Sequence, residues 1–204
     1  MTALSLMLRG GILMYLLLLI SIAVIAIVIE KYRQIFKLKK ANAALLTNLA
    51  STSSLPDMRK ALQECESDSP LSAMLNKLFN AKTDDPDLLQ QSMEAAAQGE
   101  LHKLEKGLGW LSTFAAVAPL IGFLGTVIGM VRVFMNIQAH SSGGVDISLL
   151  AGGIWEALLT TIGGLIVGIV TIIFYNDIVQ NLENIVRTMQ ESGVEYNIRV
   201  RSSR

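Results

Sequence analysis

The chain has 204 residues, 17 acidic and 17 basic side chains, and a hydrophobic fraction of 51%. The absence of net charge gives no indication of a nucleic-acid partner, and a single cysteine, Cys65, excludes an intrachain disulfide. Apolar residues that cluster in long runs, with only 17% charged residues, are typical of a membrane protein. No His and Cys residues lie at metal-ligand spacing, so the sequence predicts neither a metal site nor a cofactor.

Residues 1–9 precede an uncharged run, 10–29, that is long enough to cross a bilayer as a helix. The run exceeds the apolar region of a signal peptide and lacks a small-residue cleavage site, so we expect a retained transmembrane helix that faces lipid. Five basic residues follow within positions 31–40, which predicts a cytoplasmic side here and a periplasmic N-terminus. Such a basic run is also typical of segments that bind anionic lipid head groups.

Residues 30–106 form the predicted cytoplasmic helical domain. Ser69 and Asp85 each precede a proline, the pattern of a helix N-cap followed by proline at the first helical position. We expect the last helix of this domain to continue unbroken into the next span, since residues 94–106 contain one glycine and no proline. The predicted helices cover 57–66, 70–82 and 86–106.

The second predicted span, 107–135, carries no charge between Lys106 and Arg132. An α-helix of roughly 25 residues is about 37 Å long and can cross a bilayer. Pro119 removes the hydrogen bond to the carbonyl of Ala115, which predicts a local kink and one free carbonyl. Small residues recur on this helix at steps of three and four, a pattern that lets another membrane helix approach closely: Ala115, Ala118, Gly122, Gly125 and Gly129.

A loop without Lys or Arg, 136–148, is expected in the periplasm and leads into a third span, 149–175. The third span returns the chain to a polar cytoplasmic tail, 176–204, so the second and third spans form an antiparallel hairpin. The sequence therefore predicts an all-α membrane protein with three transmembrane helices. The third span has its own stripe of small residues: Gly153, Ala157, Thr160, Gly164, Gly168 and Thr171.

Polar residues of this hairpin are the candidates for an ion pathway. Thr126 lies roughly ten residues before the loop, and Thr160 and Thr161 lie roughly ten residues after it, so all three should lie at similar depth. Glu156 should lie one turn further out, on the face of Thr160 and about 140° from Thr161. A carboxylate within a span costs about 2.5–3.5 kcal/mol and must face protein or a wet cavity. Hydroxyls beside it can hold water or a partly dehydrated cation.

Two alternatives apply to these residues. Threonines in membrane helices often donate to their own backbone, to the carbonyl four residues earlier. Glu156 lies only about ten residues after Asp146, so it could sit near the membrane interface, with its side chain extending to the interface instead. The small-residue stripes indicate close helix packing, which is compatible with a pore in a ring of copies.

Two motifs in this sequence resemble a known family. Ala-Val-Ala-Pro-Leu-Ile-Gly-Phe-Leu-Gly-Thr-Val-Ile-Gly-Met (116–130) resembles the second-span signature of the ExbB/TolQ/MotA proton-channel family. Gly-Ile-Trp-Glu-Ala-Leu-Leu-Thr-Thr-Ile-Gly-Gly-Leu (153–165) resembles its third-span signature, except that Trp155 stands where smaller residues are common. Three spans and 204 residues favour ExbB- or TolQ-type members over the longer, four-span MotA type.

The resemblance implies a homopentamer in the bacterial inner membrane, in contact with membrane lipid. Its axial pore, lined by the second and third spans, would hold two transmembrane helices of an ExbD- or TolR-like single-span partner, which contributes an aspartate. The family's pore threonines match Thr126 and Thr161, and its third-span glutamate matches Glu156.

The resemblance also implies a function: a proton-channel or stator subunit that couples the proton motive force to work on a TonB- or TolA-like protein. The expected output is outer-membrane transport. The alternatives are a TolQ-like role in envelope constriction or protein export, and a non-conducting membrane scaffold. Threonine hydroxyls suit H⁺ and Na⁺ equally. An enzyme is not predicted, since neither His102 nor His140 is placed to serve a serine or a metal in a span.

Overall fold

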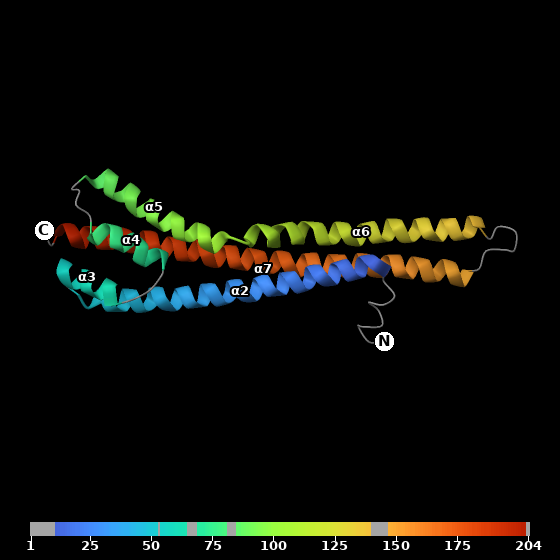
Figure 1. Cartoon of the computed structure of the whole chain (residues 1–204), viewed down its shortest axis with the longest axis horizontal. Coiled ribbons are helices and arrows are strands. Elements are labelled where there is room, and N and C mark those ends of the chain that lie inside the picture. Colours follow the sequence, from blue (N-terminus) through green and yellow to red (C-terminus); the bar gives the residue numbers. More distant parts are fainter. Residues whose placement is uncertain (1–10, 53, 65–68, 81–84, 140–146, 203–204) are drawn as a thin grey trace. The chain divides into compact units, whose positions relative to one another are not determined.

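The computed structural model describes residues 11–52, 54–64, 69–80, 85–139 and 147–202, in which helix is the only regular secondary structure (Figure 1). Cys65, His140 and Asp146, with the ends of two predicted cytoplasmic helices and most of the predicted periplasmic loop, lie outside the described residues. The helices are α2 (Gly11–Ala50), α3 (Leu55–Glu64), α4 (Pro70–Phe79), α5 (Pro86–Glu105), α6 (Leu108–Ala139) and α7 (Ile147–Ser202).

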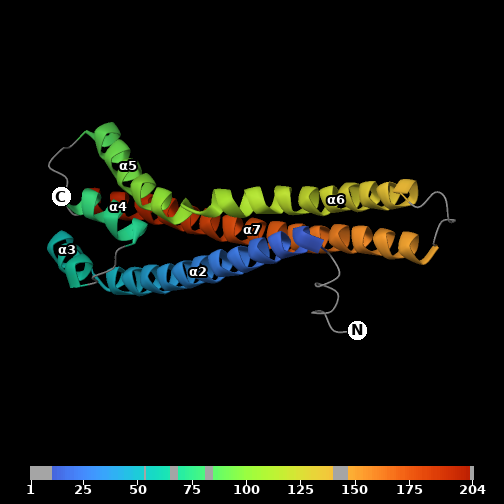
Figure 2. The same cartoon turned by 45° about the vertical axis from the view of Figure 1, so that its right-hand side comes forward.

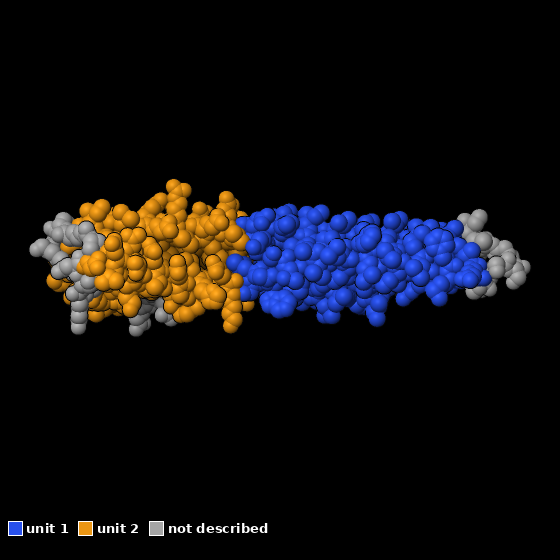
Figure 3. Space-filling model, turned by 90° about the horizontal axis from the view of Figure 1, so that it is seen from above, with its two compact units in different colours: residues 1–29, 107–176 blue, residues 30–106, 177–204 orange. Residues whose placement is uncertain are grey.

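The chain divides into two units, which Figure 3 colours separately. We call them the apolar unit, residues 1–29 and 107–176, and the polar unit, residues 30–106 and 177–204. By length and composition, three helical stretches can cross a membrane: Gly11–Ala50, Asp87–Gln138 and Leu150–Val200. The fold class predicted from the sequence, an all-α membrane protein, is confirmed.

In the apolar unit, α7 contacts both α2 and α6, and α6 runs beside α7 in two views of the molecule (Figures 1 and 2). Gly163 of α7 lies against Met14 and Leu17 of α2. One side of the first span is therefore covered by protein, because α7 supplies the small residue that this contact needs. Lipid contact stays a prediction for the exposed side of α2. The buried face of α2 repeats at steps of three and four: Met14, Leu17, Ile20, Val24 and Val28.

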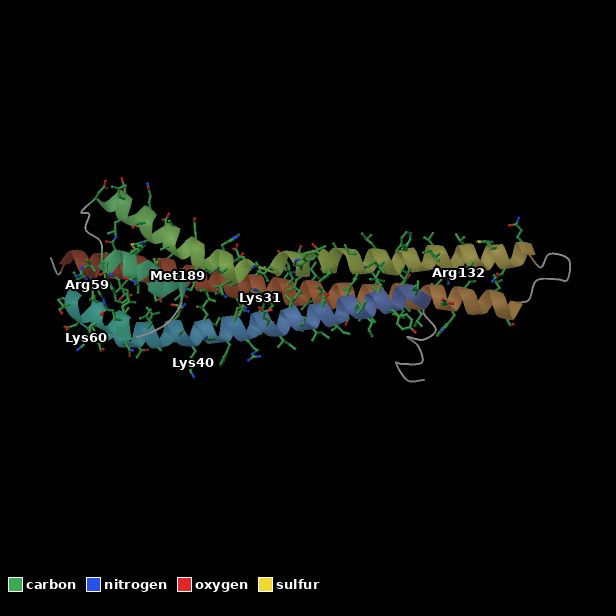
Figure 4. The ribbon with its side chains drawn as sticks, in the orientation of Figure 1. Lys31, Lys40, Arg59, Lys60, Arg132 and Met189 are labelled. Carbon is green, nitrogen blue, oxygen red and sulfur yellow. The ribbon has the colours of Figure 1, made fainter. Side chains whose placement is uncertain are left out.

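A break separates α5 from α6, so the prediction of one unbroken helix is wrong at this point. Gly107 has a φ of +95°, a backbone conformation that favours glycine and cannot continue a right-handed helix. The last carbonyls of α5 consequently lack helical partners. Lys31 of α2, only 4% exposed, donates from Nζ to the carbonyl oxygen of Leu104 at 2.9 Å (Figure 4). Burial lowers the pKa of this lysine.

The predicted caps are confirmed in the polar unit. The Ser69 side chain accepts from the Ser72 amide at the start of α4, and the Asp85 side chain accepts from the Asp87 amide at the start of α5. The tail, predicted only as polar, is a continuation of α7. Its buried residues alternate at steps of four and three, which is the spacing of a helix seam: Ile178, Leu182, Ile185 and Met189.

Replacing the buried lysine tests the cap on α5. Lys31→Met should lower the thermal midpoint and remove about 1.5–3 kcal/mol of stability, because the Leu104 carbonyl loses a charged donor. Thermal unfolding in detergent, followed by circular dichroism, measures this loss. Lys40→Met is the matched control, since Lys40 is exposed on the same helix. Equal losses in the two variants would refute the capping role.

The hydrogen bond between Tyr32 and Asp177 makes stability depend on pH. Tyr32 donates its hydroxyl to Asp177 Oδ2 at 2.5 Å. This bond, then burial and the Asp177 charge, raise the pKa of Tyr32 from 10.0 to about 12. Because the fold favours the neutral phenol, the stabilisation is complete below pH 10 and disappears between pH 10 and pH 12. Across that range, the thermal midpoint of the wild type should converge on that of Tyr32→Phe. A difference that does not vary with pH would contradict this.

Candidate functional site

The hairpin of α6 and α7 is closed by glycines that leave no room for a side chain. A Cβ atom placed on Gly164 would lie 2.6 Å from the Ala118 carbonyl oxygen and 2.8 Å from Cα of Gly122. A Cβ atom on Gly129 would lie 2.7 Å from that of Ala157, and Gly153 is in equally close contact with Val133. The two stripes of small residues thus face each other along the hairpin.

Pro119 lies within α6, which continues through it as one helix. A Cβ atom on Gly168 would lie 2.5 Å from Cγ of Pro119 and 3.1 Å from the carbonyl oxygen of Ala115. That carbonyl is the one whose helical partner the proline removes. Gly168 therefore leaves room on α7 for both the Pro119 ring and the Ala115 carbonyl of α6.

Thr126 of α6 and Thr161 of α7 form a hydroxyl pair between the two helices. Their Oγ1 atoms are 2.7 Å apart, and either can donate to the other. Thr126 Oγ1 also lies 2.8 Å from the Phe123 carbonyl oxygen, and Thr161 Oγ1 lies 3.0 Å from the Gly122 carbonyl oxygen. Each hydroxyl thus has a second acceptor, so the direction of the hydrogen bond between them can reverse without movement of heavy atoms.

Thr160 is placed differently from its neighbour. It is 2% exposed, donates to the Ala157 carbonyl oxygen at 2.7 Å, and packs against Gly125. This is the local backbone bonding that threonines in membrane helices often make. Of the two adjacent threonines, Thr161 reaches the opposite helix and Thr160 fills the contact between helices.

Glu156 lies beside the first residue of α2. A Cβ atom on Gly11 would lie 2.6 Å from Glu156 Oε1, so the carboxylate is level with the start of the first span. Glu156 Oε1 is also 4.0 Å from Nη1 of Arg132 on α6. This contact was not predicted, since Arg132 was considered above only as the end of an uncharged run. The sequence nevertheless contains a signal for this pair. The hairpin helices have two charged residues within 107–139 and 147–176, and these are Arg132 and Glu156.

Among the described residues, no three His, Cys, Asp or Glu side chains are grouped to hold a metal ion. The candidate site instead combines threonine hydroxyls, the carboxylate of Glu156 and the guanidinium of Arg132 on a closely packed hairpin. Three apolar helical stretches, two of them joined in such a hairpin, are typical of a multi-pass helical membrane protein.

The chain belongs to the MotA/TolQ/ExbB proton channel family, whose model matches residues 59–191. It is 30% identical over 175 residues to a Synechocystis protein named as an ExbB-like biopolymer transport protein, covering 84% of this chain and 68% of that one. It is 30% identical over 176 residues to the biopolymer transport protein ExbB of Neisseria meningitidis, covering 79% and 78%. A Methanothermobacter thermautotrophicus protein named as an ExbB homolog is 27% identical over 185 residues, covering 90% and 65%. This family is one of transport and channel proteins.

Adding one methyl group to the hairpin tests its packing. Gly164→Ala should destabilise the protein by about 1–3 kcal/mol, because the new Cβ would overlap backbone atoms of α6. Thermal unfolding in detergent measures the effect. Gly152→Ala is the control on the same helix, since a Cβ atom there meets nothing within 4 Å. It should leave stability unchanged or raise it through helix propensity. Equal tolerance at both positions would contradict the close packing.

Proposed function

We propose that this chain is an ion-conducting stator subunit, which couples inward proton flow to mechanical work on an envelope protein. The hydroxyl pair of Thr126 and Thr161 is the observation that carries the proposal. Two hydroxyls that can exchange donor and acceptor roles are suited to relaying a proton, and their oxygens are suited to a partly dehydrated cation. Glu156, in the same hairpin, adds a group that attracts cations.

The proposed assembly is a homopentamer with a pore lined by α6 and α7, holding an ExbD- or TolR-like partner. Both hairpin helices expose large apolar side chains, among them Phe123, Ile162 and Ile166, which suits contact with lipid, other copies or a partner. One charge crossing the membrane releases about 2.3 kcal/mol per 100 mV. We propose that this energy drives a TonB- or TolA-like protein, with outer-membrane transport as the output.

The proposed location is the bacterial inner membrane, with the N-terminus in the periplasm and the C-terminus in the cytoplasm. The basic residues between 31 and 40, directly after the first span, support this orientation. The absence of Lys and Arg from residues 136–148 supports it as well.

Proton flux in liposomes tests the conducting role. The purified chain, alone and with an ExbD- or TolR-like partner, is exposed to a pH gradient whose decay is followed with an internal dye. Thr161→Val should reduce partner-dependent flux about tenfold, equivalent to about 1.4 kcal/mol at the barrier, because it removes the hydroxyl and keeps the shape. Glu156→Gln should reduce flux as well.

Thr113→Val is the matched control for the threonine, because its hydroxyl donates only to the local Gly109 carbonyl among the bonds described for it. It should conduct like the wild type. Unchanged flux in Thr161→Val, with the oligomer intact, would favour a non-conducting scaffold. If neither the wild type nor any variant conducts protons, the same assay with a sodium gradient distinguishes a sodium-driven subunit from a scaffold.

A further inference from the structure

A small cavity lies in the apolar unit where the first turn of α2 meets the hairpin. Its volume is about 80 Å³, enough for water molecules. Gly11 of α2, Gly129 and Arg132 of α6, and Glu156 and Thr160 of α7 are among its lining residues. The cavity thus joins the carboxylate of the proposed ion pathway to a guanidinium on the facing helix.

Arg132 and Glu156 are the charged side chains among the described residues of the apolar unit. Nη1 of Arg132 lies 4.0 Å from Oε1 of Glu156, although the two residues belong to different helices. In a setting of low dielectric constant the attraction between opposite charges is much stronger than in water. The pairing therefore compensates the charge of each residue within one chain.

The start of α2 also favours the negative charge of Glu156. The amide groups of a helix N-terminus carry a partial positive charge, and the first turn of α2 contains no acidic residue to compensate it. Glu156 Oε1 lies so close to Gly11 that a Cβ atom there would approach it to 2.6 Å. The carboxylate thus lies between the Arg132 guanidinium and the start of α2.

We infer that Arg132 is a tethered cation that competes with the permeating ion for Glu156, and so gates the outer part of the pathway. This inference rests on the proposed conducting function. An arginine is charged at all relevant pH values and, being tethered, is present at a high local concentration. An ion reaches Glu156 when the guanidinium leaves it.

The geometry suits a contact that opens and closes. At 4.0 Å the pair lacks the short, two-point bonding of a fixed arginine–carboxylate bridge. The side chains are 62% and 40% exposed, so neighbouring atoms of this chain do not lock either of them in place. Arg132 lies in the C-terminal part of α6 and is labelled in Figure 4.

The test combines flux with stability. Arg132→Gln, in liposomes with the ExbD- or TolR-like partner, should conduct protons severalfold faster than the wild type, whereas Arg132→Lys, which keeps the charge, should remain near the wild type. In the Glu156→Gln background, Arg132→Gln should bring no increase. Arg187→Gln is the control, because it removes an arginine from an exposed ion pair, with Glu191, in the polar unit. A merely structural role for Arg132 would not raise flux.

Flux in Arg132→Gln that equals or falls below the wild-type flux, with the oligomer intact, would overturn the gate. A thermal-unfolding cycle of Arg132→Gln, Glu156→Gln and the double variant separates this failure from failure of the proposed function. If the wild type conducts no ion, the proposed function and the gate both fail. A non-additive cycle would then still establish the pair, and an additive one would remove the pair too.

Discussion

The contact between α6 and α7 depends on glycine at the positions where the two backbones meet. In lipid, apolar side chains gain little from meeting each other, so van der Waals contact and interhelical hydrogen bonds must hold the helices together. Gly122 provides both. A Cβ atom on Gly122 would lie 3.0–3.1 Å from backbone atoms of Thr160, Thr161 and Gly164. The Gly122 carbonyl oxygen accepts a hydrogen bond from the Thr161 hydroxyl. The same close approach brings Thr161 within 2.7 Å of Thr126. The candidate site is thus a consequence of the packing.

Polar groups within the apolar unit differ in what their neighbours allow them to do. Thr160 and Thr161 are adjacent, yet a helix turns by about 100° per residue, so one faces Gly125 and the other faces Thr126. The Thr160 hydroxyl donates to a backbone carbonyl of its own helix. The Thr161 hydroxyl bonds to the opposite helix of the hairpin. A carboxylate has no such local solution. Glu156 therefore relies on partners from two other helices, Arg132 and the start of α2.

The helical period explains which features were predictable. The facing stripes of small residues and the similar depth of Thr126 and Thr161 follow from spacing alone, and the caps at Ser69 and Asp85 follow from local chemistry. The break at Gly107 could not be predicted from spacing. Glycine inside a helix costs only about 1 kcal/mol, so glycine occurs both within helices and at helix ends. Its φ of +95° reflects the tertiary structure around the end of α5. The pairing of Arg132 with Glu156 likewise needs the contact register of the hairpin.

The two sides of the hairpin differ in the continuity of their helices. α7 carries Thr161 in the apolar unit and the Ile178–Met189 seam in the polar unit without interruption. Bending it between them would break several backbone hydrogen bonds. α5 and α6, by contrast, are already interrupted at Gly107, where the Leu104 carbonyl bonds to Lys31 in place of an amide of the next turn. The side of the hairpin that carries Thr126 and Arg132 therefore begins at an interruption of the helical backbone, while the side that carries Thr161 and Glu156 belongs to the continuous helix.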